Sequence, residues 1–447
     1  MEMLSLEEIA EAVGSASSVT GKVDRICTDT RKITENSVFI ALKGANYDGH
    51  SFVKPAIEGG ALAAITEFQI GNCPCIKVKD TRKALLDIAK FYRKKFSPIL
   101  VGVTGSVGKT TTKEMIYLVL SSKYKTLKNE GNFNNEIGVP LTLFNLDNSY
   151  KAAVIEMGMS HFGEIHRLSR VSRPTVSVIT NIGFSHIENL GSQEGICKAK
   201  LEILDGMEQE APLILNADDK ILSKICLDRE IVTYGIDNEL ADVRAINIES
   251  TLDTKFDIVY KKEIYPAKLG CIGKHNILNA LAAFSVGITC NIEPELIISA
   301  LEKYEPVGMR QRVEKKNGQT VIIDCYNASP DSMRAALSVL SQLVPENGGK
   351  RVAVLADMLE LGEMSPALHE SVGEMAVNAG IDKLICYGDN AKFIAKRADE
   401  LGLHSGFTSD KGMLLEYLRM TVNSGDVVLF KGSRGMKLEE IIGEFYE

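Results

Sequence analysis

The stretch Ile99-Leu-Val-Gly-Val-Thr-Gly-Ser-Val-Gly-Lys-Thr-Thr111 decides the fold of this chain. Its apolar start predicts a buried strand, and its glycine-rich turn leads into a helical run over residues 113–120. A strict phosphate-loop pattern requires glycine at the position of Val103, whereas the glycines here stand at positions 102, 105 and 108. Backbone N–H groups and a helix N-terminus still surround a phosphate chain in such a turn.

Lys109 and Thr110 follow the turn directly, where a lysine reaches phosphates and a hydroxyl binds Mg²⁺. The alternative is a tight strand-to-helix turn that merely requires small residues. Gly-Lys-Thr in this context favours a nucleoside triphosphate site.

Outward from this stretch, apolar runs alternate with amphipathic segments, a pattern typical of α/β domains with largely parallel sheets. With 447 residues, the chain is expected to hold several domains. We predict limits at 1–97, 98–309 and 310–447, the first ending at Lys95-Phe96-Ser97-Pro98. The predicted strands of the second and third blocks are 99–103, 152–156, 175–180, 212–216, 320–324, 351–355, 383–387 and 426–430, with shorter alternating strands over 242–269.

Composition is that of a globular protein, with 45% hydrophobic and 25% charged residues. The net charge of −8 argues against a nucleic-acid partner, although a local loop can still bind a nucleotide. The start of the chain lacks the pattern of a secretion signal, and no apolar run reaches membrane-spanning length. The nine cysteines are scattered, and we interpret them as reduced thiols of a cytoplasmic protein. We also expect a monomer.

Two side chains follow predicted neighbouring strands of the second block. Glu156 ends one strand, where an acid of the phosphate site would meet Mg²⁺, although a lone acid there is more often a cap. His186 follows the next strand and is either structural or a second metal ligand. Lys198 and Lys200 lie on a predicted amphipathic helix, and the pattern does not choose between them.

These residues together resemble the Mur ligase superfamily. The resemblance rests on motifs that run in order along the chain: Gly102–Thr111, Glu156-Met-Gly, Thr180-Asn-Ile-Gly with His186, Ala199-Lys200, Gly273-Lys-His-Asn276-Ile-Leu-Asn279 and Lys431-Gly-Ser433-Arg434. Members activate a carboxylate as an acyl phosphate with ATP, and an amine then displaces the phosphate. The resemblance implies a small α/β UDP-substrate domain, a central P-loop ATPase domain with a mostly parallel sheet, and a C-terminal Rossmann-like domain.

The resemblance also implies roles for individual residues. ATP would contact Gly105, Ser106, Gly108, Lys109, Thr110, Thr111, Asn276, Asn279, Arg310 and Asp324. Mg²⁺ would be held by Thr110, Glu156, His186 and a carbamoylated Lys200, and catalysis would depend on Lys109, His186, Lys200 and Arg310. Substrates would contact Thr30, Arg31, Asp48, Gly49, His50, Asn134, Asn135, Tyr326, Asn327, Ser329 and Pro330.

The first and third blocks distinguish between the members. The segments Thr28-Asp-Thr-Arg31 and Tyr47-Asp-Gly-His50 resemble the UDP-binding domain of the members that add the third residue or the final dipeptide, although Asp48-Gly-His50 alone could be a simple turn. Asp324-Cys-Tyr-Asn-Ala-Ser-Pro330 and Ala356-Asp-Met-Leu-Glu-Leu-Gly362 resemble motifs of the D-alanyl-D-alanine adder. Ser329 and Ala356 depart from its usual asparagine and glycine. The implied substrates are UDP-N-acetylmuramoyl-tripeptide and D-alanyl-D-alanine.

Four other interpretations fit the sequence less well. A third-residue adder should carry an Asp-Asn-Pro motif, which the sequence lacks. A folylpolyglutamate-type enzyme lacks a UDP-binding first domain. A GTPase-like switch should carry Asn-Lys-x-Asp, which is also missing. A catalytically dead homologue is disfavoured because every expected chemical position is filled.

Overall fold

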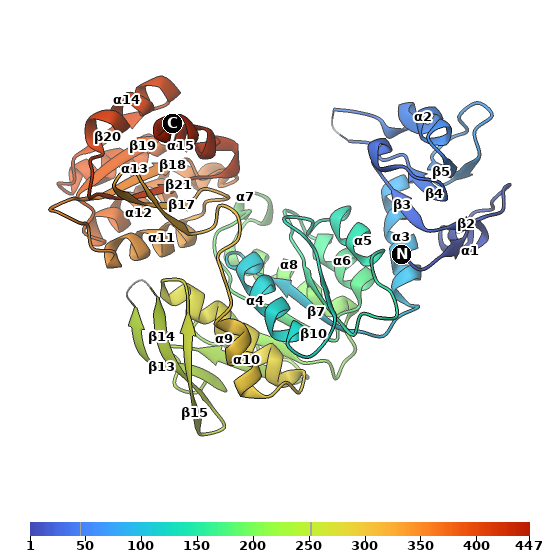
Figure 1. Ribbon diagram of the computed structural model, residues 1–447, viewed down its shortest axis with the longest axis horizontal. Helices are drawn as coiled ribbons and strands as arrows, with labels where there is room; N and C mark the ends of the chain where they lie inside the picture. The colour runs from blue at the N-terminus through green and yellow to red at the C-terminus, as the bar shows by residue number, and fades with distance from the viewer. Residues whose placement is uncertain (45, 251–252) are drawn as a thin grey trace.

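Three sheets, each with its own helices, follow one another along the chain in the computed structural model, which describes residues 1–44, 46–250 and 253–447. Figure 1 shows the N-terminal domain in blue and the C-terminal domain in orange and red, on either side of a central domain. The expected α/β architecture is confirmed. We propose the limits 1–97, 98–309 and 310–447, which give each of the three large sheets a domain of its own.

The N-terminal domain is built on a four-stranded parallel sheet of order β3-β4-β5-β6. Its strands are β3 (Arg25–Cys27), β4 (Ser37–Ile40), β5 (Ala61–Thr66) and β6 (Cys75–Lys77), beside a short antiparallel pair, β1 (Leu4–Ser5) and β2 (Lys22–Val23). The helices are α1 (Leu6–Ala12), α2 (Val53–Glu58) and α3 (Thr81–Arg93).

Helix α3 fastens this domain to the central one. Asp80 caps its start by accepting hydrogen bonds from the N–H groups of Arg82 and Lys83. At its end, the Tyr92 hydroxyl donates to the carbonyl of Leu146 at 2.6 Å. Arg93 Nε donates to the carbonyl of Ser172 at 2.9 Å. Both side chains are buried, so the last turn of α3 belongs to the core between the two domains.

The central sheet has nine strands in the order β15-β14-β13-β12-β11-β10-β7-β9-β8. The strands from β8 to β13 pair in parallel, and β14 and β15 extend the sheet as an antiparallel meander. The bounds are β7 (Ile99–Thr104), β8 (Thr126–Lys128), β9 (Ala152–Glu156), β10 (Val176–Ile179), β11 (Leu213–Asn216), β12 (Ile231–Gly235), β13 (Val243–Ser250), β14 (Thr254–Tyr260) and β15 (Glu263–Leu269).

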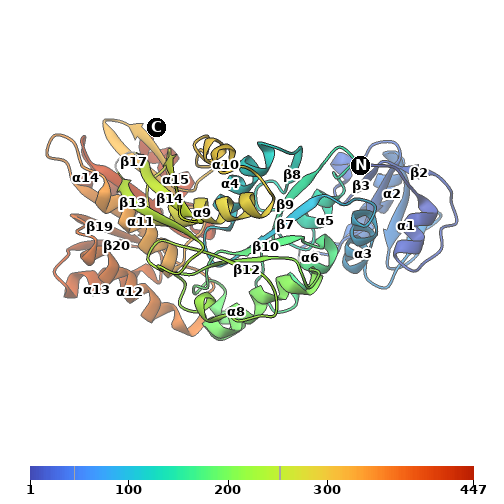
Figure 2. The same cartoon turned by 90° about the horizontal axis from the view of Figure 1, so that it is seen from below.

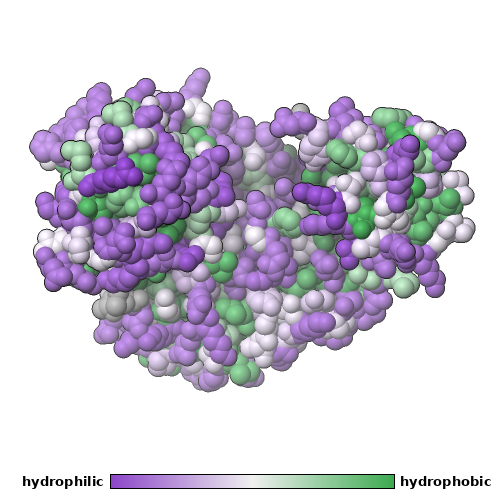
Figure 3. Space-filling view, turned by 45° about the horizontal axis from the view of Figure 1, so that its top comes forward, coloured by the Kyte–Doolittle hydropathy of each residue, from purple (hydrophilic) through white to green (hydrophobic). Residues whose placement is uncertain are grey.

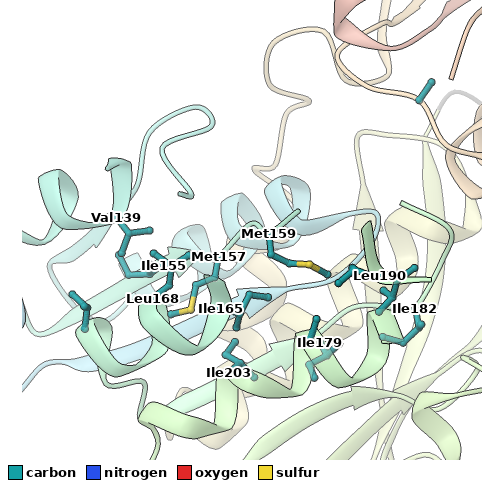
Figure 4. Close-up of a cluster of buried hydrophobic side chains, with 14 of the residues drawn as sticks. Val139, Ile155, Met157, Met159, Ile165, Leu168, Ile179, Ile182, Leu190 and Ile203 are labelled. Atoms are coloured by element: carbon teal, nitrogen blue, oxygen red, sulfur yellow. The ribbon is translucent and has the colours of Figure 1, made fainter. Parts of the chain in front are cut away.

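Helices cover both faces of this sheet, as Figure 2 shows. On one face pack α4 (Lys109–Ser121), α9 (Lys274–Thr289) and α10 (Pro294–Leu301), and on the other α5 (Gly138–Leu143), α6 (Glu164–Ser172) and α8 (Gln193–Leu201), with the short α7 (Ile187–Leu190) near the edge of the site. Figure 4 shows the apolar layer on the second face, where Ile155, Met157, Ile165 and Leu168 interlock. Burial of this layer fixes the strand ends that carry the site.

The C-terminal sheet has the order β16-β17-β21-β18-β19-β20, parallel except for β16 against β17. Its strands are β16 (Arg312–Lys316), β17 (Gln319–Asp324), β18 (Arg351–Ala356), β19 (Lys383–Tyr387), β20 (Ser405–Thr408) and β21 (Val427–Lys431). Helices α11 (Pro330–Gln342), α12 (Ser365–Asn378) and α13 (Ala391–Glu400) pack on one face, and α14 (Lys411–Thr421) and α15 (Leu438–Tyr446) on the other.

The predicted strands of the second and third blocks are confirmed to within two residues at each end, and the shorter strands over 242–269 are β13, β14 and β15. All nine cysteines lie in the described part of the chain as free thiols, and six of them are buried. No helix among the described residues is long and apolar enough to cross a membrane.

Candidate active site

The phosphate loop connects β7 to α4 at the centre of the sheet. Val103 is fully buried inside β7, so the position where a strict motif has glycine belongs to the strand and not to the loop. Gly105 and Gly108 have φ values of 152° and 84°. A Cβ on Gly105 would lie 1.9 Å from Thr180 Oγ1, and one on Gly108 would lie 2.6 Å from Asn279 Oδ1. The loop therefore requires glycine at both positions.

The segment after β10 ties this loop down. The Thr180 hydroxyl donates to the carbonyl of Val107 at 2.7 Å, and the N–H of Val107 donates to Asn181 Oδ1 at 2.9 Å. The N–H of Gly183 donates to Ser106 Oγ at 2.9 Å. The predicted Thr-Asn-Ile-Gly motif therefore acts by fixing the shape of the phosphate loop.

Lys109 opens α4 and lies within the loop. Its Nζ donates to the carbonyl oxygens of Gly105 at 2.8 Å and Ser106 at 3.2 Å. Burial lowers the pKa of Lys109, Glu156 opposes this shift, and Arg310 adds to it. The ammonium is thus held where the backbone N–H groups of the loop and the N-terminus of α4 also converge.

Glu156 and Thr110 form a buried pair beside the loop. The Thr110 hydroxyl donates to Glu156 Oε2 at 2.9 Å, and Asn134 Nδ2 donates to Oε1 at 2.8 Å. Glu156 is 1% exposed. Mg²⁺ prefers hard oxygen ligands and often takes only one or two carboxylates, its other ligands being waters and substrate phosphates. The Thr110–Glu156 pair fits that donor set, although no cluster of three or more acidic, His or Cys ligands occurs among the described residues.

The structure distinguishes the two lysines of α8. Lys198 is exposed, whereas Lys200 is 2% exposed. Burial lowers the pKa of Lys200 well below its ordinary value, and the nearby charge of Lys109 lowers it further. A buried amine with a depressed pKa is available in its neutral, nucleophilic form. Of the two lysines, Lys200 is therefore the one whose surroundings suit the carbamoylation that the resemblance implies.

His186 lies at the start of α7 with a left-handed backbone, φ 63°. Its ring lines the same cavity as Lys109 and Thr110. Its Nδ1 lies 2.5 Å from Glu360 Oε2 of the C-terminal domain. The sequence did not predict the contact between His186 and Glu360.

The residues expected near the nucleoside form one hydrogen-bonded group. Asn276 Nδ2 donates to Gln311 Oε1 at 2.6 Å, and Asn279 Oδ1 accepts from the Thr112 hydroxyl at 3.0 Å. His275 Nε2 lies 3.1 Å from Gln311 Oε1, and burial lowers the pKa of His275. Gln311 carries no motif in the sequence, and only its place after Met309-Arg310 could have drawn attention to it.

The C-terminal domain contributes a charged wall. Lys431 Nζ, at the end of β21, contacts Asp324 Oδ2 at 2.7 Å and donates to the carbonyl of Asn327 at 3.1 Å. The Arg310 guanidinium lies over the Tyr326 ring, 4.1 Å from its centroid. The sequence singles out Lys431 only as the first residue of the Lys431-Gly-Ser433-Arg434 motif.

Most of these groups line one cavity of about 520 Å³. Figure 3 shows the molecule hollowed between its N-terminal and C-terminal domains. The predicted residues in its lining are Ser106, Gly108, Lys109, Thr110, Thr111, Asn134, Asn135, Glu156, His186, Asn276, Asn279, Arg310, Asp324, Tyr326, Asn327 and Ser329. Arg82 at the start of α3 also lines it and was not predicted.

The predicted substrate residues of the N-terminal domain lie elsewhere, because the cavity lining formed by the described residues includes none of them. Asp48 Oδ1 contacts His50 Nδ1 at 2.6 Å, and His50 Nε2 accepts from the N–H of Glu67 at 2.9 Å. A Cβ on Gly49 would lie 2.6 Å from the carbonyl oxygen of Leu42. These residues shape a loop, while Thr30 and Arg31 lie on a short 3₁₀ turn with Arg31 exposed.

Ser329 and Pro330 begin α11. The Ser329 hydroxyl accepts from the N–H of Ser332, and Pro330 occupies the first turn, where it needs no donor. Pro330 is buried and outside the described lining of the cavity, as are Gly105 and Lys200. A serine is a good substitute for asparagine here because both residues cap helices.

Comparison with known proteins places the chain in a family. The model described as the Mur ligase middle domain matches residues 103–287, the Mur ligase glutamate ligase domain matches 310–434, and the Mur ligase family catalytic domain matches 22–93. The UDP-N-acetylmuramoyl-tripeptide–D-alanyl-D-alanine ligase of Bacillus subtilis is 41% identical over 434 residues, which cover 94% of this chain and 93% of that protein. The enzyme of the same name from Escherichia coli is 35% identical, covering 95% and 94%.

Solved structures agree with these relatives. A crystal structure of MurF from Acinetobacter baumannii superposes with a TM-score of 0.93 at 30% identity, covering 100% of this chain and 99% of that one. MurF ligase from Thermotoga maritima in complex with ADP gives a TM-score of 0.85 at 30% identity, covering 94% and 97%. Three family models in order, relatives matching nearly end to end and a shared three-domain fold lead to one conclusion: the chain belongs to the Mur ligase family.

Proposed function

We propose that this protein joins D-alanyl-D-alanine to UDP-N-acetylmuramoyl-tripeptide at the expense of ATP, giving UDP-N-acetylmuramoyl-pentapeptide, ADP and phosphate. The observation that carries the reaction type is that Lys109, Thr110 and Glu156 of the central domain line the same cavity as Arg310 and Asp324 of the C-terminal domain. The choice of substrates is supported by the names of relatives 41% and 35% identical along nearly the whole chain. The reaction would supply a peptidoglycan precursor in the cytoplasm.

The roles of the side chains follow from their positions. Lys109 and the N–H groups of the loop would bind the β- and γ-phosphates while the tripeptide carboxylate attacks the γ-phosphorus and ADP leaves. Arg310 would stabilise the charge that develops on the transferred group. The dipeptide amine then attacks the acyl carbon, its proton passes to solvent, and the C–O bond to phosphate breaks. Thr110 and Glu156 would hold Mg²⁺, which supplies charge neutralisation on the phosphates.

Lys200 would act after covalent modification. Its neutral Nζ attacks CO₂, a N–C bond forms and one proton leaves, so that a buried cation becomes a carbamate anion. Together with His186 this anion would complete a second Mg²⁺ site. In the unmodified form, burial and the charge of Lys109 disfavour protonation of Lys200, which supports the modification.

The three-domain layout supports a division of binding. Asn276 and Asn279 would face the adenine and Asp324 the ribose, since these residues line one end of the cavity with Gln311. The N-terminal loop residues Thr30, Arg31 and Asp48–His50 would bind the UDP moiety, and residues 326–330 the dipeptide. We also propose that the enzyme works as a monomer.

The decisive test is phosphate release from MgATP with UDP-N-acetylmuramoyl-tripeptide, with and without D-alanyl-D-alanine, followed by mass analysis of the product. The expected result is dipeptide-dependent release together with the UDP-linked pentapeptide. Release that instead requires the UDP-linked dipeptide and a free diamino acid would reassign the chain to third-residue addition. No release with either pair would overturn the ligase proposal.

A further inference from the structure

A carboxylate of the C-terminal domain lies against a histidine of the central domain. Glu360 Oε2 is 2.5 Å from His186 Nδ1. Glu360 lies between β18 and the 3₁₀ turn Gly362–Met364, and its φ of 62° matches the left-handed φ of 63° at His186. The turn packs on α7, and a Cβ on Gly362 would lie 3.0 Å from the Glu188 side chain. The two domains therefore meet at these loop tips.

The contact decides which nitrogen of His186 faces the cavity. Nδ1 is buried against Glu360, and at 2.5 Å its contact with Oε2 is close, although the angle is not that of a regular hydrogen bond. His186 lines the cavity beside the phosphate loop, and because Nδ1 is buried against Glu360, Nε2 is the nitrogen left for a ligand there. A carboxylate beside one imidazole nitrogen favours the tautomer with the proton on that nitrogen and orients the ring, so that the other nitrogen can bind a metal.

We infer that Glu360 is a positioning residue for metal binding by His186, so that a carboxylate–histidine–metal arrangement is assembled across the domain interface. The inference rests on the proposed function, which makes His186 a metal ligand. Glu360 does not touch the metal or a substrate. Its consequence is reciprocal coupling: docking of the C-terminal domain strengthens the metal site, and the metal strengthens docking.

The loop that carries Glu360 is rigid enough for this role. The N–H of Met358 donates to His369 Nε2 at 3.0 Å, and the N–H of Leu359 donates to Ser433 Oγ at 2.9 Å. Asp357 Oδ1 accepts from the N–H of Ala391 at 2.7 Å. The side chain of Glu360 is 56% exposed, so replacing it leaves the core intact.

The test is equilibrium Mn²⁺ binding followed by electron paramagnetic resonance, with a nonhydrolysable ATP analogue and bicarbonate in every sample. The variants are Glu360→Gln, His186→Ala and the double variant, with Glu363→Gln as a matched control. Glu363 is an exposed acid three residues away, and its replacement removes the same charge. Binding is measured directly, so turnover plays no part in the result.

We expect Glu360→Gln to weaken one of two Mn²⁺ sites by about 10–100-fold while the other site and the Glu363→Gln protein stay unchanged. The double variant should bind no worse than His186→Ala, because Glu360 acts through the histidine. Loss of one site in His186→Ala with normal binding in Glu360→Gln would overturn this inference and leave the metal assignment standing. Two intact sites in His186→Ala would overturn the assignment itself.

Discussion

Lys113 has no exposed surface, although it carries a charge on the second turn of α4. Its Nζ donates to the carbonyl of Asn129 at 2.8 Å and lies 3.1 Å from Glu114 Oε1 and 3.9 Å from Glu156 Oε2. Removing one member of a buried charge group leaves the others uncompensated. We expect Lys113→Met to lower the free energy of unfolding by about 3–5 kcal/mol, measured by urea denaturation.

The matched control is Lys83→Met, which breaks the exposed ion pair with Asp87 one turn along α3. That change should cost only about 0.3–0.5 kcal/mol, because solvent screens the pair. Equal losses in the two variants would show that Lys113 is not a buried partner of Glu156 and Glu114.

Lys109 differs from Lys113, because the role proposed for it is phosphate binding and it contributes little to the core. Lys109→Ala should lower kcat by at least roughly 10²–10³-fold, the usual effect of removing one donor to a developing charge. The melting temperature should change little, because the lysine bonds only to its own loop carbonyls. Phosphate-release kinetics measure the loss of kcat, and thermal denaturation measures the melting temperature. A near-normal rate would refute the phosphate assignment.

At the scale of elements, His369 on α12 holds the loop after β18. The neutral ring accepts the Met358 N–H at Nε2 and approaches the Ser365 carbonyl through Nδ1 at 2.7 Å. Burial lowers the pKa of His369 below 6.5. As pH falls below 6.5 the unfolded chain gains a proton that the folded ring resists, so stability is present above pH 6.5 and is lost below it.

Urea denaturation between pH 8 and pH 5 measures this effect. The unfolding free energy should fall below pH 6.5 by about 1.4 kcal/mol per unit of pKa depression, and His369→Gln should flatten that fall. Replacing the exposed His404 by glutamine provides the comparison and should leave the slope unchanged. An identical pH profile for His369→Gln and the parent protein would exclude the ring as its source.

Sequence patterns predicted the buried strands better than the edge strands of the C-terminal sheet. The strands β7, β9 and β19 were predicted because buried parallel strands are continuous apolar runs. The edge strands β16 (Arg312–Lys316) and β20 (Ser405–Thr408) were not predicted. Each borders solvent, so charged and small polar residues replace the apolar signal. Their place in the sheet is set by pairing with β17 and β19.

The residues of the candidate site also divide into those that sequence patterns predict and those that only the tertiary fold brings together. Lys109, Thr110 and Glu156 could be predicted because they follow regular strands and begin a helix. Arg82 and Gln311 come from a helix start and a linker, and only the tertiary fold brings them to the cavity. Asp48 and His50 carry a family motif, yet their hydrogen bonds support a loop, which sequence spacing alone could not distinguish from a ligand contact.

At the scale of the whole molecule, ligand binding should stabilise the fold by linkage. A nonhydrolysable ATP analogue with Mg²⁺, at one hundred times its Kd, should add about 2.7 kcal/mol to the unfolding free energy. Chelation with EDTA should remove most of this gain, because Glu156 then repels the phosphates. In EDTA, Glu156→Gln should bind the analogue at least as well as the parent protein. Isothermal titration with and without Mg²⁺ checks this, and metal-independent binding by the parent protein would contradict it.

The attachment of α3 has a consequence for how the protein melts. Tyr92 and Arg93 end the helix inside the central domain, where they bond to the carbonyls of Leu146 and Ser172. The C-terminal domain has a sheet of its own and, on the side of α14 and α15, a core cluster of its own, whereas the side of α11, α12 and α13 belongs to a buried cluster that also includes residues of the first two domains. Because α3 ends inside the central domain, heat should unfold the first two domains in a single calorimetric transition. A chain shortened to begin at residue 98 should aggregate, because it exposes the surface that α3 covers.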